Sequence, residues 1–85
     1  MTTYERAMAK FGKERQMRKL QEECAELAAE VNKYLEGRSS LDELLGEMAD
    51  VSICLEQMRC YFTNTAIDTA IARKLMKLEK YLEAP

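Results

Sequence analysis

Two short acidic motifs contain the residues of this sequence that are best suited to do chemistry. The motif at residues 22–26 has the form E-E-x-x-E, and the motif at residues 47–50 has the form E-x-x-D. On a helix, acids spaced three apart share one face. The four acids that pair in this way are Glu23, Glu26, Glu47 and Asp50. Either motif alone is common on solvated helix faces, but the two together predict a metal site, because converging carboxylates repel one another without a cation.

The donor atoms indicate which metal would bind. Oxygen ligands without Cys or His partners favour Mg²⁺ or Mn²⁺ over zinc. The chain has no His, which excludes His-based zinc sites and Ser-His-Asp triads. Protein-bound Mg²⁺ usually shares itself with substrate phosphates, so the implied substrate is a polyphosphate. The expected chemistry is attack of metal-activated water on phosphorus.

Four helices are predicted to position these acids, with glycines ending the first two and hydroxyl side chains capping the others. The predicted spans are 3–11, 13–36, 40–62 and 65–82. The predicted N-caps are Thr3, Ser40 (in a capping box with Glu43) and Thr65. The fold class is therefore all-α, an antiparallel bundle of about four helices in a single domain covering residues 1–85.

Short connections predict that consecutive helices lie antiparallel. Glu26 precedes Gly37 by 11 residues and Glu47 follows it by 10. At about 1.5 Å rise per residue, the two motifs should then lie level across the hairpin. Two apolar lines on the third predicted helix flank its acidic strip, which predicts packing on both sides and partial enclosure of the acids.

Size and charge limit the partners of the chain. A domain of 85 residues buries only roughly 60–65% of the surface of its unfolded chain, so oligomerisation is the expected source of further burial. The net charge of −2 argues against nucleic acid as a partner. The apolar runs are far shorter than the roughly 20 residues that span a bilayer, and no signal peptide is present, so a cytoplasmic protein is expected. The three cysteines are expected to be buried, reduced thiols.

The pattern of acids resembles that of the MazG-like all-α nucleoside triphosphate pyrophosphohydrolases, whose signature is E-E-x-x-E on one helix and E-x-x-D on the next. Residues 11–16 and 41–58 also look like the small bacterial and phage members, and the resemblance covers residues 4–62 well and the last helix loosely. It implies hydrolysis of NTPs or dNTPs to monophosphate and pyrophosphate, and assembly as a homodimer or homotetramer with sites shared between subunits. The Mg²⁺ ligands implied by the resemblance are Glu23, Glu26, Glu47 and Asp50.

The general base and the substrate contacts are less sharply defined. The base is expected to be Glu23 or Glu26, or else a metal-bound hydroxide that needs no separate residue. Polar residues on the face of the first motif and basic residues of the last helix are candidate contacts to the substrate, although each also fits an ordinary solvated helix position. These candidates are Gln16, Lys33, Arg73, Lys74 and Lys77.

Two other functions fit the same sequence. One is a non-enzymatic helical interaction module, or adaptor, that keeps the bundle without turnover. The other is a phosphoribosyl-ATP pyrophosphohydrolase-like enzyme, which would share the chemistry of the site. Titration with magnesium separates an enzyme from an adaptor, because only a specific site gains stability from the bound ion.

Overall fold

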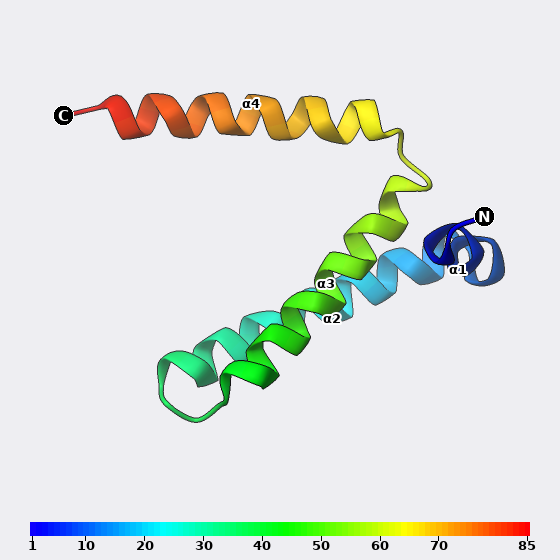
Figure 1. The fold of residues 1–85 in the computed structure, drawn as a ribbon, viewed down its shortest axis with the longest axis horizontal. Coiled ribbons are helices and arrows are strands. Elements are labelled where there is room, and N and C mark those ends of the chain that lie inside the picture. The colour runs from blue at the N-terminus through cyan, green and yellow to red at the C-terminus, as the bar shows by residue number, and fades with distance from the viewer.

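The computed structural model describes all 85 residues and contains four α-helices and no strands (Figure 1). The all-α prediction and the number of helices are confirmed. The helices are α1 (Thr3–Phe11), α2 (Lys13–Leu35), α3 (Leu41–Arg59) and α4 (Asn64–Glu83). None of the four combines the length and the apolar character needed to cross a bilayer.

Side-chain caps begin three of the helices. Ser40 caps α3 as predicted, accepting a hydrogen bond from the Glu43 backbone N–H at 3.1 Å. The predicted caps Thr3 and Thr65 are wrong: the caps are Thr2 on α1 and Thr63 on α4, whose extended backbones let the hydroxyl accept from the N–H three residues on.

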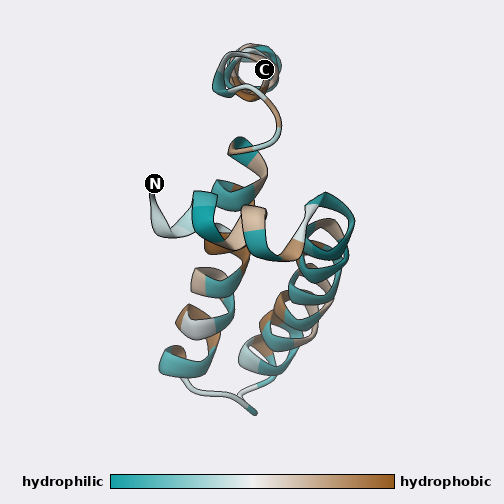
Figure 2. Cartoon of the chain, turned by 90° about the vertical axis from the view of Figure 1, so that its right-hand side faces the viewer, coloured by the Kyte–Doolittle hydropathy of each residue, from teal (hydrophilic) through white to brown (hydrophobic).

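Helices α2 and α3 form the antiparallel hairpin that the short connection predicts, and their contact is by far the largest between elements. The connection turns at Gly37, whose φ of 74° lies in the left-handed region that glycine adopts without strain. Helix α1 crosses the open end of the hairpin (Figure 2). The buried apolar residues are Met8 on α1 and Cys54 and Met58 on α3, and α1 contacts α3.

Helix α4 leaves the body of the molecule after the bend at residues 60–63 and extends away from the hairpin (Figure 1). The expectation that a short link folds every helix back against its neighbour is therefore wrong for α4 in the single chain. The physical reason is that link length limits only the separation of two helices, whereas packing needs a complementary apolar face. Of the residues of α4, only Ile67 is even partly buried.

The single chain is far from compactly packed. Only five of its 85 residues are buried. Its radius of gyration is 15.8 Å, whereas a compact domain of this length has one of about 12 Å. Its accessible surface is 6826 Å², about 1,700 Å² more than a compact monomer of its mass exposes. Much of this excess belongs to large apolar side chains on α2, α3 and α4.

Candidate metal centre

Three carboxylates meet where α2 and α3 lie side by side. Glu23 and Glu26 come from successive turns of α2, and Glu47 comes from the facing side of α3. One oxygen of each lies within 4.8 Å of the others. The two motifs therefore lie level across the hairpin, as the equal distances from Gly37 along the chain require.

Two oxygens of this acidic cluster are buried without a partner. Glu23 is one of five buried residues, only 6% exposed, and its Oε2 accepts no hydrogen bond. Glu47 Oε2 is likewise enclosed and unpaired. A buried carboxylate oxygen without a donor is costly, commonly by about 1–3 kcal/mol or more. A cation bound by both carboxylates would offset this cost.

The surroundings of Glu47 oppose its ionisation. Desolvation by burial raises the pKa of this carboxyl above its ordinary value, and repulsion from Glu26, Asp50 and Glu23 adds to the effect. The same arrangement that penalises a bare carboxylate favours a bound divalent ion, because the ion reverses the sign of the local field.

The donor set fits Mg²⁺ or Mn²⁺. All three cluster ligands are carboxylate oxygens, the hard donors that these ions prefer. The nearby Cys54 thiol is buried, and burial followed by the Glu23 charge raises its pKa, so it stays protonated and supplies no soft thiolate. In octahedral Mg²⁺ complexes opposite oxygens lie about 4.2 Å apart, so small side-chain rotations bring the three oxygens to ligand positions.

The raised pKa of Glu47 predicts how pH affects the metal-free protein. The folded state holds the Glu47 proton more tightly than the unfolded chain does. Ionising Glu47 therefore costs folding stability, and this cost is absent below about pH 4.5 and grows as pH rises through the folded-state pKa. In metal-free buffer, the wild type should therefore lose melting temperature relative to a Glu47→Gln variant as the pH increases. Thermal melts of both proteins from acid to neutral pH test this, and saturating Mg²⁺ should raise the wild-type value at neutral pH.

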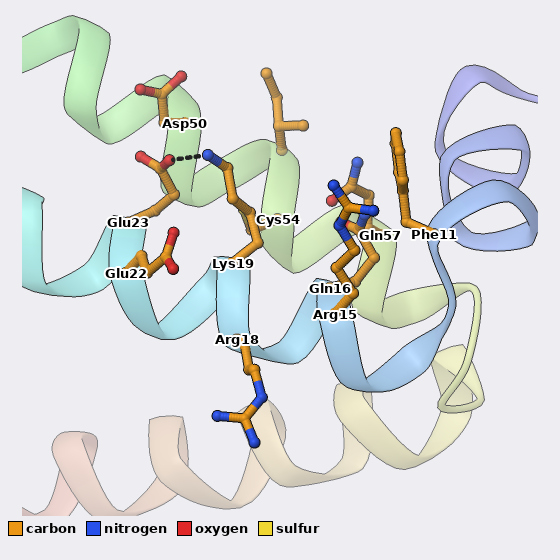
Figure 3. A pocket seen from close by; sticks show the side chains of 11 residues that line it. Phe11, Arg15, Gln16, Arg18, Lys19, Glu22, Glu23, Asp50, Cys54 and Gln57 are labelled. Carbon is orange, nitrogen blue, oxygen red and sulfur yellow. Dashed lines mark ion pairs between the residues drawn. The ribbon is translucent and has the colours of Figure 1, made fainter.

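Asp50, the fourth predicted ligand, lies outside the three-oxygen cluster. It is exposed on α3, one turn beyond Glu47, and lies beside Glu23 at the acidic end of a cavity (Figure 3). Its charge still contributes to the raised pKa of Glu47, so it belongs to the same electrostatic neighbourhood.

The cavity next to the cluster has a volume of about 570 Å³ and lies along α2 and α3, closed at one end by Phe11. Its lining combines an aromatic ring, two amides, three basic and three acidic side chains with two apolar ones. These residues are Phe11, Arg15, Gln16, Arg18, Lys19, Glu22, Glu23, Asp50, Ile53, Cys54 and Gln57. Figure 3 shows the acids at one end, and Phe11, Arg15 and the two amides at the other.

Lys19 is a residue of this site that the sequence analysis missed. Its Nζ lies 3.0 Å from Glu23 Oε1, and it stands between the acidic and the aromatic ends of the cavity (Figure 3). The signal was present in the sequence, since Lys19 precedes Glu23 by four residues, the spacing of an ion pair along a helix. Arg15, also missed, lies with its guanidinium 4.8 Å from the centre of the Phe11 ring.

Only one of the five predicted substrate contacts lines the cavity in the structure. Gln16 is buried and lines the cavity. Lys33 is exposed in the last turn of α2, outside the cavity lining. Three others, all exposed on α4, lie away from the site of their own chain: Arg73, Lys74 and Lys77.

The prediction that all three cysteines are buried is wrong for two of them. Cys54 is buried, but Cys24 and Cys60 are exposed in the single chain.

Comparison with known proteins identifies no relative. No family model, no curated protein and no solved structure matches this chain.

Proposed function

We propose that this protein is a Mg²⁺-dependent nucleoside triphosphate pyrophosphohydrolase of the MazG-like kind, which cleaves NTPs or dNTPs to a monophosphate and pyrophosphate. Mn²⁺ fits the same ligands. One observation carries the proposal: Glu23 and Glu47, each with a buried, unpaired carboxylate oxygen, converge with Glu26 beside a cavity that also holds basic and aromatic groups.

The charges of the cavity favour a polyphosphate as the substrate. An anion cannot approach the carboxylates unaided, because like charges repel at close range. Bound Mg²⁺ typically retains open or water-filled positions that phosphate oxygens occupy. Lys19, which lines the cavity beside Glu23, supplies further positive charge for the phosphates.

The opposite end of the cavity suits a nucleoside. The Phe11 ring offers a stacking surface, and the amides of Gln16 and Gln57 can donate to and accept from base edges (Figure 3). A volume of about 570 Å³ lies in the usual range of small-molecule sites. Cleavage between the α- and β-phosphates requires the α-phosphate, next to the nucleoside, to lie near the acids.

Glu26 is the better placed of the two candidate bases. Glu23 is buried and engaged with Lys19, whereas Glu26 is exposed and forms no ion pair or side-chain hydrogen bond. A bound Mg²⁺ ion acidifies water and stabilises negative charge on phosphate oxygens. Glu26 would orient the attacking water with one oxygen and accept its proton as the bond to phosphorus forms.

The proposed assembly is a homodimer, or a homotetramer built from it. If each of two chains buries its excess surface of about 1,700 Å², the interface totals about 3,400 Å², within the range of obligate dimers. The apolar stripe of α4, which includes Ile71, Leu75 and Leu78, provides part of that surface. Packed on a partner through this stripe, α4 would bring Lys74, which flanks the stripe, within reach of the partner's substrate, whereas Arg73 and Lys77 lie toward the opposite side of the helix.

An adaptor without turnover remains the alternative, since exposed apolar faces also suit binding to other proteins. The buried, unpaired oxygens favour the enzyme. An adaptor gains nothing from carboxylates that weaken its fold, whereas strain of this kind is common in functional sites.

The direct test is release of pyrophosphate from a panel of NTPs and dNTPs, with phosphoribosyl-ATP included. We expect turnover of at least one nucleotide in Mg²⁺, a weaker or altered rate in Mn²⁺, and none in excess chelator. Pyrophosphate, rather than orthophosphate, must appear together with the monophosphate. Absence of turnover across the panel, with no rise in melting temperature on adding Mg²⁺, would rule out the enzyme and leave the adaptor.

A further inference from the structure

We infer that the ammonium group of Lys19 neutralises Glu23 when no metal ion is bound there. When the metal binds, the Lys19 side chain swings away from Glu23 and pairs with the substrate polyphosphate instead. This inference rests on the proposed function and assigns to one side chain two successive roles, competitor of the metal and then ligand of the substrate.

The geometry places Lys19 between the two groups it would serve. Its Nζ contacts Glu23 Oε1 at 3.0 Å, while Oε2 of the same carboxylate is buried without a partner. The Glu23 side chain is only 8% exposed and is held in place, whereas that of Lys19 is 54% exposed and has room to move. Both side chains line the cavity assigned to the nucleotide.

The charges explain why this ion pair must rearrange. In the metal-free site, Lys19 is the only cationic side chain within ion-pair distance of the cluster acids Glu23, Glu26 and Glu47. A divalent ion bound by Glu23 would lie only a few ångströms from the ammonium, and the two positive charges would repel each other. The flexible lysine stem lets the ammonium swing along the cavity without any change in the backbone. A bound polyphosphate then offers it new oxygen partners.

Neighbouring basic residues do not share this position. Arg18 lies one residue earlier and pairs with Glu14 at 3.1 Å, and Figure 3 shows its side chain directed away from the acids. Arg15 stacks on Phe11 instead. The inference is therefore specific to Lys19, and Lys13, which is exposed on the same helix outside this cavity, supplies a control of the same residue type.

The experiment compares Lys19→Met with Lys13→Met by titration calorimetry of the 85-residue protein. With Mn²⁺ alone, Lys19→Met should bind the ion about two- to fivefold more tightly than the wild type, the range expected for loss of one competing ion pair. With Mg²⁺ present, its affinity for a nucleoside triphosphate carrying a methylene bridge between the α- and β-phosphates should fall about tenfold. Lys13→Met should show neither change at comparable size.

The opposite signs of the two effects make the result decisive. Equal or weaker Mn²⁺ binding by Lys19→Met would overturn the inference, and so would unchanged binding of the nucleotide analogue. Both titrations are repeated with a second variant, Lys19→Gln. Circular dichroism verifies the helical content of each variant. If the wild type itself binds no Mn²⁺, the proposed metal centre fails together with the inference, which distinguishes that failure from a wrong role for Lys19.

Discussion

Glu47→Gln is expected to abolish Mg²⁺-dependent nucleotide hydrolysis, lowering kcat/KM by about a thousandfold or more. The substitution keeps the size of the side chain and removes its charge, so the cluster loses the only ligand that α3 contributes to it. The helices should remain folded, because Glu47 forms no ion pair or hydrogen bond that holds the hairpin together. Pyrophosphate release and calorimetric titration with Mg²⁺ measure the two losses.

Glu56→Gln is the matched control for this substitution. Glu56 lies on the same helix, half-exposed, and pairs with Arg59 rather than with the cluster acids. Its rate and its Mg²⁺ affinity should equal those of the wild type. Full activity of Glu47→Gln would show that the three carboxylates are not the centre of the chemistry.

The Asp50→Asn variant tests whether Asp50 is a fourth ligand of the metal ion. Because Asp50 lies beside Glu23 but outside the three-oxygen cluster, a rotation of its side chain decides its role. We expect loss of turnover, as for Glu47→Gln, in keeping with the E-x-x-D pattern. An unchanged Mg²⁺ affinity would restrict the site to Glu23, Glu26 and Glu47.

A double substitution on α4 is expected to convert the assembled protein to monomers. The two changes are Leu75→Asp and Leu78→Asp. Both leucines are about half-exposed in the single chain, at 53% and 49%, and lie on the same apolar stripe. Burying a leucine contributes about 1.5–3 kcal/mol, and a buried aspartate is far more costly, so the Kd of a dimer should rise at least a thousandfold, about 4 kcal/mol. Sedimentation or light scattering at micromolar concentration measures the change.

A control pair lies on the opposite side of the same helix, at Thr69→Asp and Met76→Asp. It adds the same charge and should leave the assembly intact. A wild-type chain that is monomeric and fully active would contradict the proposed assembly, and would remove the role given to Lys74 of α4.

The amino-acid pattern was sufficient to predict the helices and the meeting of three of the four acids, Glu23, Glu26 and Glu47. Helix spans follow from local rules: glycines at 12 and 37 end helices, hydroxyl residues begin them, and apolar residues recur every three or four positions. The alignment of Glu26 with Glu47 followed from counting residues on either side of Gly37, because helical rise is constant. The caps at Thr2 and Thr63 were missed by one or two residues, since several hydroxyls compete at each start.

Three features depended on contacts between residues distant along the chain. The burial of Glu23, unlike its local pairing with Lys19, depends on how α3 packs against α2. The separation of Asp50 from the cluster depends on how the two helices are rotated against each other. The path of α4 depends on whether an apolar partner exists for its stripe, and within one chain there is none. Local propensity specifies helices, but the burial of each side chain depends on the surface that faces it, which lies elsewhere in the chain or on another molecule.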